Sequence, residues 1–222
     1  MKKTLLTICL VWMCFSLSAQ KIIDLSGKWS FSIDRQDNGE KEKWFSHTLN
    51  DFINLPGSMP EKLKGDEVTA KTQWTGSLYD SSYYYNPYME KYRKEGNIKF
   101  PFFLTPDKHY VGAAWYQKEV NIPADWKGER ILLFLERPHI ETTVWVNGQK
   151  TGMQNSLCVP HQYDITRYVR PGKCTITIRV DNRIKEINVG PDSHSITDQT
   201  QGNWNGIVGR ICLQNDSENI FR

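Results

Sequence analysis

The side chains best suited to ligand chemistry lie near the end of the chain, between Val189 and Trp204. This stretch is rich in carboxylate, amide, hydroxyl and imidazole groups, is poor in apolar residues, and ends at an indole ring. Carboxylates and amides can hold adjacent hydroxyl groups in bidentate hydrogen bonds, and an indole face can cover C–H bonds. A pyranose presents both kinds of surface. The pattern therefore predicts a loop able to contact saccharides, although a solvated polar loop would have the same composition.

The sequence patterns of several other chemistries are missing. The chain has no Gly-x-Ser-x-Gly elbow, no HExxH helix and no phosphate-binding loop. Glu136, Glu141 and Asp181 fall in strand or strand-end contexts and are interpreted as surface charges. No pair of carboxylates is therefore predicted to act together in acid–base catalysis.

The cysteines do not indicate a metal site. Of the 5 cysteines, Cys158, Cys174 and Cys212 lie beyond the N-terminal segment, without CxxC spacing or a neighbouring histidine. Cys174 and Cys212 are predicted to be buried apolar thiols in strands, although a disulfide is possible in an oxidising compartment. We expect no metal and no cofactor.

Composition and charge describe a globular chain. The 222 residues are 39% hydrophobic, 24% charged and 12% aromatic, which excludes a disordered or low-complexity protein. A formal net charge of +3, from 28 Lys and Arg against 25 Asp and Glu, is too small to demand a nucleic-acid partner.

The N-terminus resembles an export signal. Lys2 and Lys3 precede an apolar run over 5–17, and small residues follow at Ser16, Ser18 and Ala19. This run is too short for a comfortable membrane span. Residues 1–19 are therefore predicted to be a signal peptide of a periplasmic or secreted protein, with no membrane contact after cleavage; a retained N-terminal anchor is the alternative.

Short strands are predicted over most of the remaining chain. Apolar residues alternate with polar ones over 173–180 and 140–146, the period of a half-buried strand. The second of these runs into Asn147-Gly148, a strong signal for a tight hairpin because both central positions need a positive φ. Residues 130–135 are continuously apolar, as in a strand buried on both faces.

The remaining segments complete an all-β pattern. Further strands are predicted over 28–33, 115–122 and 207–213. No segment keeps a helical apolar period, although 164–169 and 89–95 could each form one short turn of helix. Short strands without intervening helices predict an antiparallel β-sandwich of jelly-roll type over 20–222.

An aromatic-rich insertion interrupts this pattern at about 57–110. Six of the 10 tyrosines fall between Tyr79 and Tyr92, and little alternation is present. A loop of this length inside a compact domain is usually functional or packed over something. Exposed rings could stack on glycan rings, but packing against a sheet or a following domain is the favoured interpretation.

Seven segments carry a family resemblance. They are DLSGKW at 24–29, AWYQKEV at 114–120, RILLF at 130–134, VWVNG at 144–148, PHQYDIT at 160–166, TITIRVDN at 175–182 and GNWNGIVGRI at 202–211. In this order, over nearly all of the chain, they resemble the sugar-binding domain of family 2 glycoside hydrolases. This family includes β-galactosidases, β-glucuronidases and β-mannosidases. The resemblance implies a galactose-binding-domain-like jelly roll, followed in such enzymes by immunoglobulin-like and (β/α)₈ barrel domains.

The resemblance also implies a site. In the family, the loop matching 189–204 reaches toward the active site of the barrel and gives an acidic or amide contact to the terminal sugar of a glycan. Asp198 is the first candidate for this contact, although its alignment varies among relatives. The implied sugar-binding residues are Asp198, Asn203, Trp204, Asn205, His194 and Tyr110.

The sequence shows no pair of catalytic carboxylates, which limits the function that can be predicted. Retaining glycosidases need two carboxyl groups about 5–5.5 Å apart, and the family carries them on the barrel, for which this chain shows no βα pattern. We expect a non-catalytic, carbohydrate-binding module of a secreted family 2 glycosidase, whose partners are a terminal sugar and the downstream domains, with no nucleic acid. A free-standing carbohydrate-binding protein and a structural interaction module are the alternatives.

Overall fold

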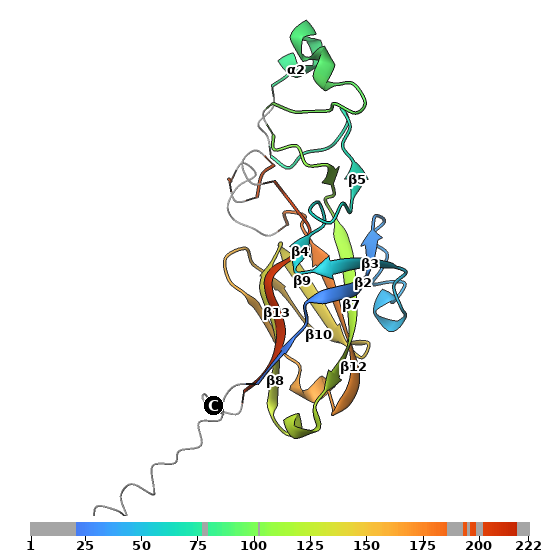
Figure 1. Cartoon of the computed structure of the whole chain (residues 1–222), viewed down its shortest axis with the longest axis vertical. Coiled ribbons are helices and arrows are strands. Elements are labelled where there is room, and N and C mark those ends of the chain that lie inside the picture. Colours follow the sequence, from blue (N-terminus) through green and yellow to red (C-terminus); the bar gives the residue numbers. More distant parts are fainter. Residues whose placement is uncertain are drawn as a thin grey trace, which may run out of the picture.

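The computed structural model describes residues 21–76, 80–101, 103–185, 193–194, 196–198 and 202–216. Two antiparallel β-sheets pack face to face in a sandwich, and a loop-rich segment projects from one end of it (Figure 1). The predicted all-β antiparallel fold is confirmed. The predicted signal peptide over 1–19 lies outside the described residues, and export stays a prediction.

The first sheet is centred on the strand that closes the chain. Its main path runs β1 (Ile22–Asp24), β13 (Gly206–Asp216), β8 (Arg130–Pro138) and β11 (His161–Asp164), and β4 (Gly57–Ser58) also pairs with β13. In β8, Leu133 and Leu135 face the core, and Phe134 on the other face is buried under the guanidinium of Arg210, 5.1 Å from the ring centroid. Leu132 is only half-buried, so the predicted burial on both faces holds for most of this strand.

The second sheet has six strands. Its order is β10 (Gln149–Asn155), β9 (Glu141–Val146), β12 (Gly172–Asp181), β7 (Ala113–Ile122), β2 (Gly27–Asp34) and β3 (Asp51–Leu55). β12 pairs along its whole length with β7 and along half of it with β9, so the two predicted alternating strands are neighbours.

The hairpin between β9 and β10 confirms the turn prediction. Asn147 and Gly148 have φ values of 50° and 77°, and Val146 pairs with Gln149 across the turn. Positive φ at both central positions gives the turn a twist that matches the flanking strands. The Asn147 side chain also joins the hairpin to β12, because its Oδ1 accepts a hydrogen bond from the backbone N–H of Thr175 (2.9 Å).

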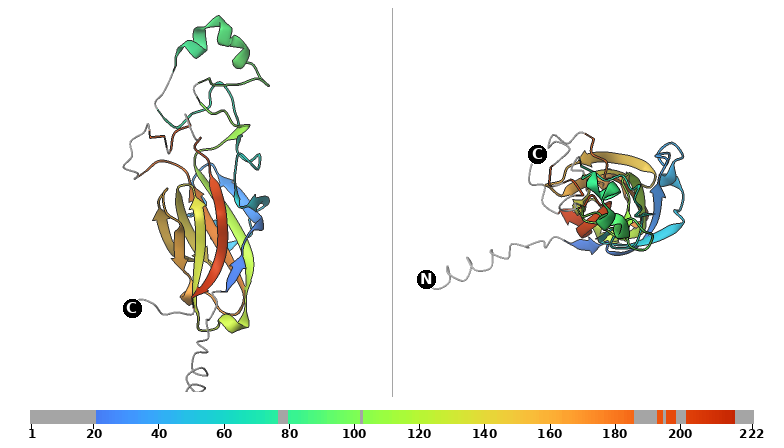
Figure 2. Two further views of the ribbon diagram at one scale, coloured as in Figure 1. Left: turned by 60° about the vertical axis from the view of Figure 1, so that its left-hand side comes forward. Right: turned by 90° about the horizontal axis from the view of Figure 1, so that it is seen from above.

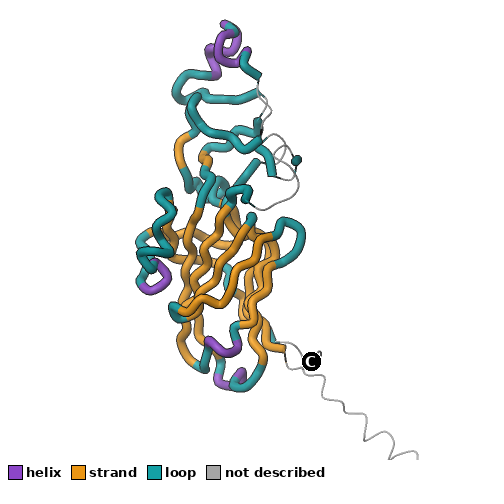
Figure 3. Tube along the Cα trace, turned by 180° about the vertical axis from the view of Figure 1, so that it is seen from behind, coloured by secondary structure: helices purple, strands orange, loops and turns teal. Residues whose placement is uncertain are grey.

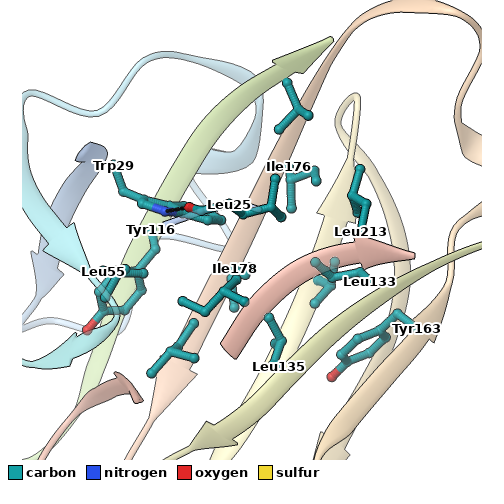
Figure 4. Close-up of a cluster of buried hydrophobic side chains, with 14 of the residues drawn as sticks. Leu25, Trp29, Leu55, Tyr116, Leu133, Leu135, Tyr163, Ile176, Ile178 and Leu213 are labelled. Atoms are coloured by element: carbon teal, nitrogen blue, oxygen red, sulfur yellow. Dashed lines mark hydrogen bonds between the residues drawn. The ribbon is translucent and has the colours of Figure 1, made fainter. Parts of the chain in front are cut away.

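The core lies between the two sheets. Trp29 and Tyr116 from the second sheet face Leu133, Leu135 and Leu213 from the first, as Figure 4 shows. All five side chains are fully buried. The Trp29 indole also donates a hydrogen bond from Nε1 to the carbonyl of Leu25 (2.8 Å), so burial leaves no unpaired polar atom on it.

A second apolar cluster covers the outer face of the six-stranded sheet. Trp115, Trp145 and Leu49 are buried there, with Trp44 and Phe45 packed against them. Phe45 stacks on Trp145 with ring centroids 5.2 Å apart and an interplanar angle of 5°. The chain between β2 and β3, including η1 (Trp44–Ser46), thus covers the sheet, and β9 is buried on both faces. Trp115 and Trp145 therefore serve to pack this loop on the sheet.

The interpretation of Glu141 and Asp181 as surface charges is wrong. Asp181 is fully buried and Glu141 is 8% exposed, and both pair with Arg179 and Lys185. Burial alone would raise the pKa of Asp181, but hydrogen bonds from Arg183 and Lys185 outweigh burial and hold this pKa well below its ordinary value. Alternation along a strand does not show that its outer face is covered by a loop, so the sequence did not reveal this burial.

The segment over 57–110 forms the projection at one end of the sandwich (Figure 2). It begins at β4 and contains β5 (Asp66–Glu67), α2 (Ser82–Tyr85), η2 (Pro87–Tyr92) and β6 (Lys108–His109), with β5 paired to β6. Most of it is loop, whereas the strands concentrate in the sandwich (Figure 3).

Aromatic rings hold the 57–110 segment together. Trp74 lies against Phe100 and Phe103, with centroids 5.0 and 5.2 Å away, and Tyr83 stacks on Phe100 at 4.8 Å. Tyr83 and Phe100 are buried, whereas Tyr85 and Tyr88 at the tip are 73% and 85% exposed. The rings therefore pack mainly on one another.

Short helical turns occur where two were predicted. η2 overlaps the turn predicted over 89–95, and η4 (Thr166–Tyr168) falls within 164–169. The remaining 3-10 turn, η3 (Ala124–Trp126), follows Pro123 at the end of β7 and buries Trp126.

Candidate functional site

The described residues Asp198 and 202–204 of the predicted loop lie beside the 57–110 segment. Three of the six predicted sugar-binding residues, Asp198, Asn203 and Trp204, line one pocket of about 310 Å³. The other residues that line this pocket are Ser58, Pro60, Leu104, Thr105, Pro106 and Gly202.

Asp198 is the hydrogen-bonding centre of this region. Its side chain is 1% exposed. Oδ1 accepts a hydrogen bond from the backbone N–H of Asn203 (2.6 Å), and Oδ2 accepts one from the backbone N–H of Thr75 (2.7 Å). His109 Nε2 lies 3.3 Å from the same Oδ2. The carboxylate is thus largely occupied by protein groups, which favours a positioning role over direct contact with a ligand.

Asn203 combines a fixed amide nitrogen with a free oxygen. Nδ2 donates to Thr75 Oγ1 and to the carbonyl of Asn182, both at 3.0 Å. The side chain is 2% exposed, and its Oδ1 has no hydrogen-bond partner among the described residues. A buried unpaired acceptor costs free energy, and most such groups in native proteins find a protein or solvent partner. This unpaired oxygen thus belongs to a residue that lines the pocket.

Trp204 is held from behind by His139. The two rings stack with centroids 4.6 Å apart and an interplanar angle of 22°, and His139 Nδ1 donates to the Trp204 carbonyl (2.7 Å). Burial lowers the pKa of His139 to about 4, so its ring is neutral at pH 7. The indole itself is half-buried and lines the pocket. This arrangement fixes an aromatic surface in the wall.

Asn205 and Tyr110 belong to the scaffold. Asn205 is fully buried, donates to the carbonyls of Gly112 and Val180, and accepts a hydrogen bond from the hydroxyl of Tyr116 (2.7 Å). The Tyr110 hydroxyl donates to the carbonyl of Ala113 (2.9 Å), and burial raises its pKa far above the ordinary value. Neither residue lines the pocket. The structure therefore does not bring them to the predicted site.

His194 is also outside the pocket. It is exposed and is not among the residues that line the hollow beside Trp204. The structure therefore does not bring His194 to this pocket, and its contact with sugar stays a prediction.

The site includes residues that the sequence did not indicate. Thr75, Leu104 and His109 lie far from Asp198 along the chain and meet it only because the 57–110 segment folds back over the loop. His139 was missed because nothing in its sequence neighbourhood distinguishes it from a strand-end residue.

Metal and thiol chemistry find little support in the part of the chain that the structure describes. No group of three or more His, Cys, Asp or Glu residues there could hold a metal ion. Cys174 and Cys212 are buried thiols, as predicted, and burial raises the pKa of Cys174 to about 11. Cys158 is exposed. No helix within the described ranges is long and apolar enough to cross a membrane.

The fold and the pocket define a class: an antiparallel β-sandwich with a polar and aromatic pocket at one end. The sequence profile described as "Glycosyl hydrolases family 2, sugar binding domain" matches residues 22–216. The chain therefore belongs to this family, which confirms the resemblance seen in the sequence motifs.

Relatives of known name include β-glucuronidases. The chain is 27% identical over 164 residues to a β-glucuronidase of Paenibacillus borealis, a match covering 73% of this chain and 21% of that protein. It is 24% identical over 181 residues to the β-glucuronidase of Homo sapiens, covering 76% and 22%. A β-galactosidase of Thermoanaerobacter pseudethanolicus matches at 26% over 102 residues, covering 45% and 14%. The chain thus spans about a fifth of the length of the curated relatives it matches.

Solved structures share the fold. A β-glucuronidase from an uncultured Clostridium species superposes with a TM-score of 0.58 at 20% identity, covering 89% of this chain and 29% of that chain. A Ruminococcus gnavus β-glucuronidase gives a TM-score of 0.57 at 17% identity, covering 88% and 29%. At these identities the likeness supports the jelly-roll architecture and nothing finer.

Proposed function

We propose that this chain recognises the terminal sugar of a glycan on behalf of an exo-acting family 2 β-glycosidase of the β-glucuronidase or β-galactosidase kind. Family membership and the names of the relatives support this assignment. The chain acts as a non-catalytic module beside immunoglobulin-like and barrel domains, which carry the bond-cleaving carboxylates. Whether the terminal sugar is a uronic acid or a neutral sugar is decided by the binding experiment below.

One observation carries the proposal. Asn203 Oδ1 is a buried acceptor without a partner in the described part of the chain, in the wall that also holds the half-buried ring of Trp204. A sugar hydroxyl can donate to this oxygen while the C–H face of the ring lies on the indole. Asp198 orients Asn203 and the adjacent Trp204, because its carboxylate accepts a hydrogen bond from the backbone N–H of Asn203. The pocket has the polar and aromatic lining that a pyranose requires.

We assign catalysis to another domain because one carboxylate lines the pocket among the residues that the structure describes. This carboxylate, on Asp198, is occupied by two backbone N–H groups and faces His109. Retaining hydrolysis requires a second carboxyl group about 5–5.5 Å away. This chain is therefore proposed to bind sugar without cleaving the glycosidic bond.

Binding by the purified full chain tests the proposal. We would titrate it with methyl β-D-glucuronide and methyl β-D-galactoside by calorimetry. Replacing Trp204 with alanine should weaken binding about five- to thirtyfold, which corresponds to about 1–2 kcal/mol for a lost aromatic contact. Trp44→Ala is the matched control, because Trp44 is a partly buried indole on the outer face of the six-stranded sheet. Equal losses in both variants would contradict the assignment.

Export is proposed on the N-terminal sequence alone. The basic start, the short apolar run and the small residues up to Ala19 support a cleaved signal peptide and a periplasmic or secreted location. The mass of the protein recovered from the extracytoplasmic fraction of expressing cells tests this. A mature N-terminus near Gln20 is expected, and a full-length species retained in the membrane would overturn it.

A further inference from the structure

The 57–110 segment is fastened to the sugar-recognition loop at several points. The backbone N–H of Thr75 donates to Asp198 Oδ2, and the backbone N–H of Asp198 donates back to the Thr75 carbonyl (3.0 Å). The N–H of Leu104 donates to the Asp198 carbonyl (2.9 Å), and His109 lies against the Asp198 carboxylate. These hydrogen bonds fix the segment in one position beside the pocket.

The same stretch lines two hollows. Leu104, Thr105 and Pro106 form part of the pocket that holds Asn203 and Trp204, and they also line a larger groove of about 910 Å³. Leu104 is 52% exposed, so it lies at the surface where the two hollows share a wall. Both volumes lie within the range of about 300–1,000 Å³ that is usual for ligand sites.

The groove has the lining of a saccharide site. Its apolar surface comes from Met89, Tyr92 and Phe103, and its polar groups come from residues such as Lys99 and Asp107. Aromatic faces and a few charged or amide groups suit the two surfaces of a sugar ring. The groove lies entirely within the 57–110 segment, apart from the sandwich.

We propose that this groove is a second subsite, which takes the sugar linked to the terminal residue of the glycan. The inference rests on the proposed function, because the terminal sugar must first occupy the pocket beside Trp204. Leu104, Thr105 and Pro106 line both hollows, so the hollows are adjacent, and in this proposal the glycan crosses this stretch from one hollow to the other. The 57–110 segment thereby makes the module selective for the second residue of the glycan as well as for the first.

A saccharide fits the groove better than a protein surface does. An apolar docking face would be expected to collect the exposed rings of this segment, but Tyr85 and Tyr88 lie at its tip and are not among the residues that line the groove. The groove instead combines aromatic side chains with an ammonium and carboxylates at its edge. A protein partner in the groove is an outcome that the experiment can detect.

The test compares two ligands on the full chain by calorimetry. One is methyl β-D-glucuronide, and the other is a disaccharide with β-linked glucuronic acid at its non-reducing end; the galactose pair is used if only galactosides bind. The disaccharide should bind at least about tenfold more tightly. Tyr92→Ala should remove this advantage while leaving the affinity for the monosaccharide within about twofold. Tyr88→Ala is the matched control and should change neither affinity, because Tyr88 does not line the groove.

A second variant protects the test against misfolding. Asp107 is exposed and lines the groove, so Asp107→Ala should reduce the disaccharide advantage without disturbing packing. Equal affinities for the two ligands in the unmodified chain would overturn the second subsite and leave the proposed function standing, as would equal losses for both ligands in Tyr92→Ala. Binding of neither ligand would contradict the proposed function itself and the subsite with it.

Discussion

Asp198 shows how a residue can belong to a site without touching the ligand. The family resemblance points to it as a sugar contact, yet its carboxylate accepts two backbone N–H groups and faces His109. A carboxylate occupied in this way sets the geometry of its neighbours. We propose that the direct contacts come from Asn203 and Trp204, which line the pocket and of which Asn203 carries an unpaired side-chain oxygen.

Replacing Asp198 with alanine should therefore destabilise the protein. The buried N–H of Asn203 and the half-buried N–H of Thr75 would lose their acceptor, at a cost of about 1–3 kcal/mol for a fully buried unpaired group. We expect a loss of about 3 kcal/mol in the free energy of unfolding, measured by urea denaturation. Asp125→Ala is the control: its ion pair with Lys21 is exposed to solvent, so its loss should leave the free energy of unfolding nearly unchanged. An Asp198→Ala protein of unchanged stability, with unchanged amide hydrogen exchange at Thr75, would contradict this role of the Asp198 carboxylate.

His139 predicts a loss of stability in acid. Burial lowers its folded-state pKa to about 4, against about 6.5 in the unfolded chain. Between these values the unfolded chain binds the proton more readily, so stability falls as the pH is lowered from about 6.5 to 4, by about 3 kcal/mol from this group. Urea denaturation across this pH range measures the loss.

The variant His139→Gln isolates this contribution. Glutamine stays neutral, so the decline between pH 6.5 and 4 should become smaller. It should not vanish, because burial also lowers the pKa of His161. An identical pH dependence in the variant and the unmodified chain would show that His139 does not titrate as described.

At the scale of elements, one close approach joins the sandwich to the 57–110 segment. β4 pairs with the first residues of β13, and a Cβ added at Gly206 would lie 2.5 Å from the Gly57 carbonyl oxygen. Gly206 also has a φ of 144°. Only glycine fits both conditions without strain. Gly206, within the family segment at 202–211, thus allows β4 to pack closely against β13.

Gly206→Ala should consequently cost more than backbone strain alone. Gly128→Ala is the matched control, because Gly128 has a φ of 87° with nothing within 4 Å of an added Cβ. The control should lose about 1–2 kcal/mol, the usual cost of a left-handed conformation. Gly206→Ala should lose at least about 2 kcal/mol more in thermal or urea denaturation, since the β4–β13 pairing must also shift. Equal losses of unfolding free energy in Gly206→Ala and Gly128→Ala would show that the β4–β13 contact adjusts at little cost.

Elements were easier to predict than contacts between them. The six strands and the Asn147-Gly148 hairpin followed from alternation and turn chemistry, which are local properties. The burial of Asp181 did not, because it depends on a loop that covers the outer face of β12. Within the site, Asp198, Asn203 and Trp204 were found because they are close in sequence. The contributions of Thr75 and Leu104 arise from the fold of a distant segment, which no local pattern encodes.

At the scale of the whole molecule, the sandwich and the projecting 57–110 segment together line the pocket at which we propose sugar recognition. The 57–110 segment projects from one end of the sandwich (Figures 1 and 2), and its residues Leu104, Thr105 and Pro106 line the pocket together with Asp198. Among the described residues, Asp198 alone brings a carboxylate to this pocket, and protein donors occupy it. We therefore propose that this chain binds the sugar and that another domain cleaves the glycosidic bond.

The purified chain should accordingly release no 4-nitrophenol from 4-nitrophenyl β-D-glucuronide or β-D-galactoside above the uncatalysed rate. The reason is the lack of a paired acid and nucleophile at the pocket. Absorbance at neutral pH, followed over hours at high protein concentration, measures this. Hydrolysis that disappears in Asp198→Ala would assign a catalytic role to this carboxylate and contradict the proposal that the chain binds sugar without cleaving it.

The most direct measurement is a ¹H–¹⁵N correlation spectrum of the chain during titration with methyl β-D-glucuronide or methyl β-D-galactoside. The indole N–H of Trp204, assigned through Trp204→Phe, and the amide signals of Asn203 should shift together and saturate. The indole signals of the buried core residues Trp29 and Trp126 should stay in place. Saturating shifts at these two residues would establish sugar recognition at the pocket. An unchanged spectrum with both glycosides, or shifts confined to other surfaces, would contradict it.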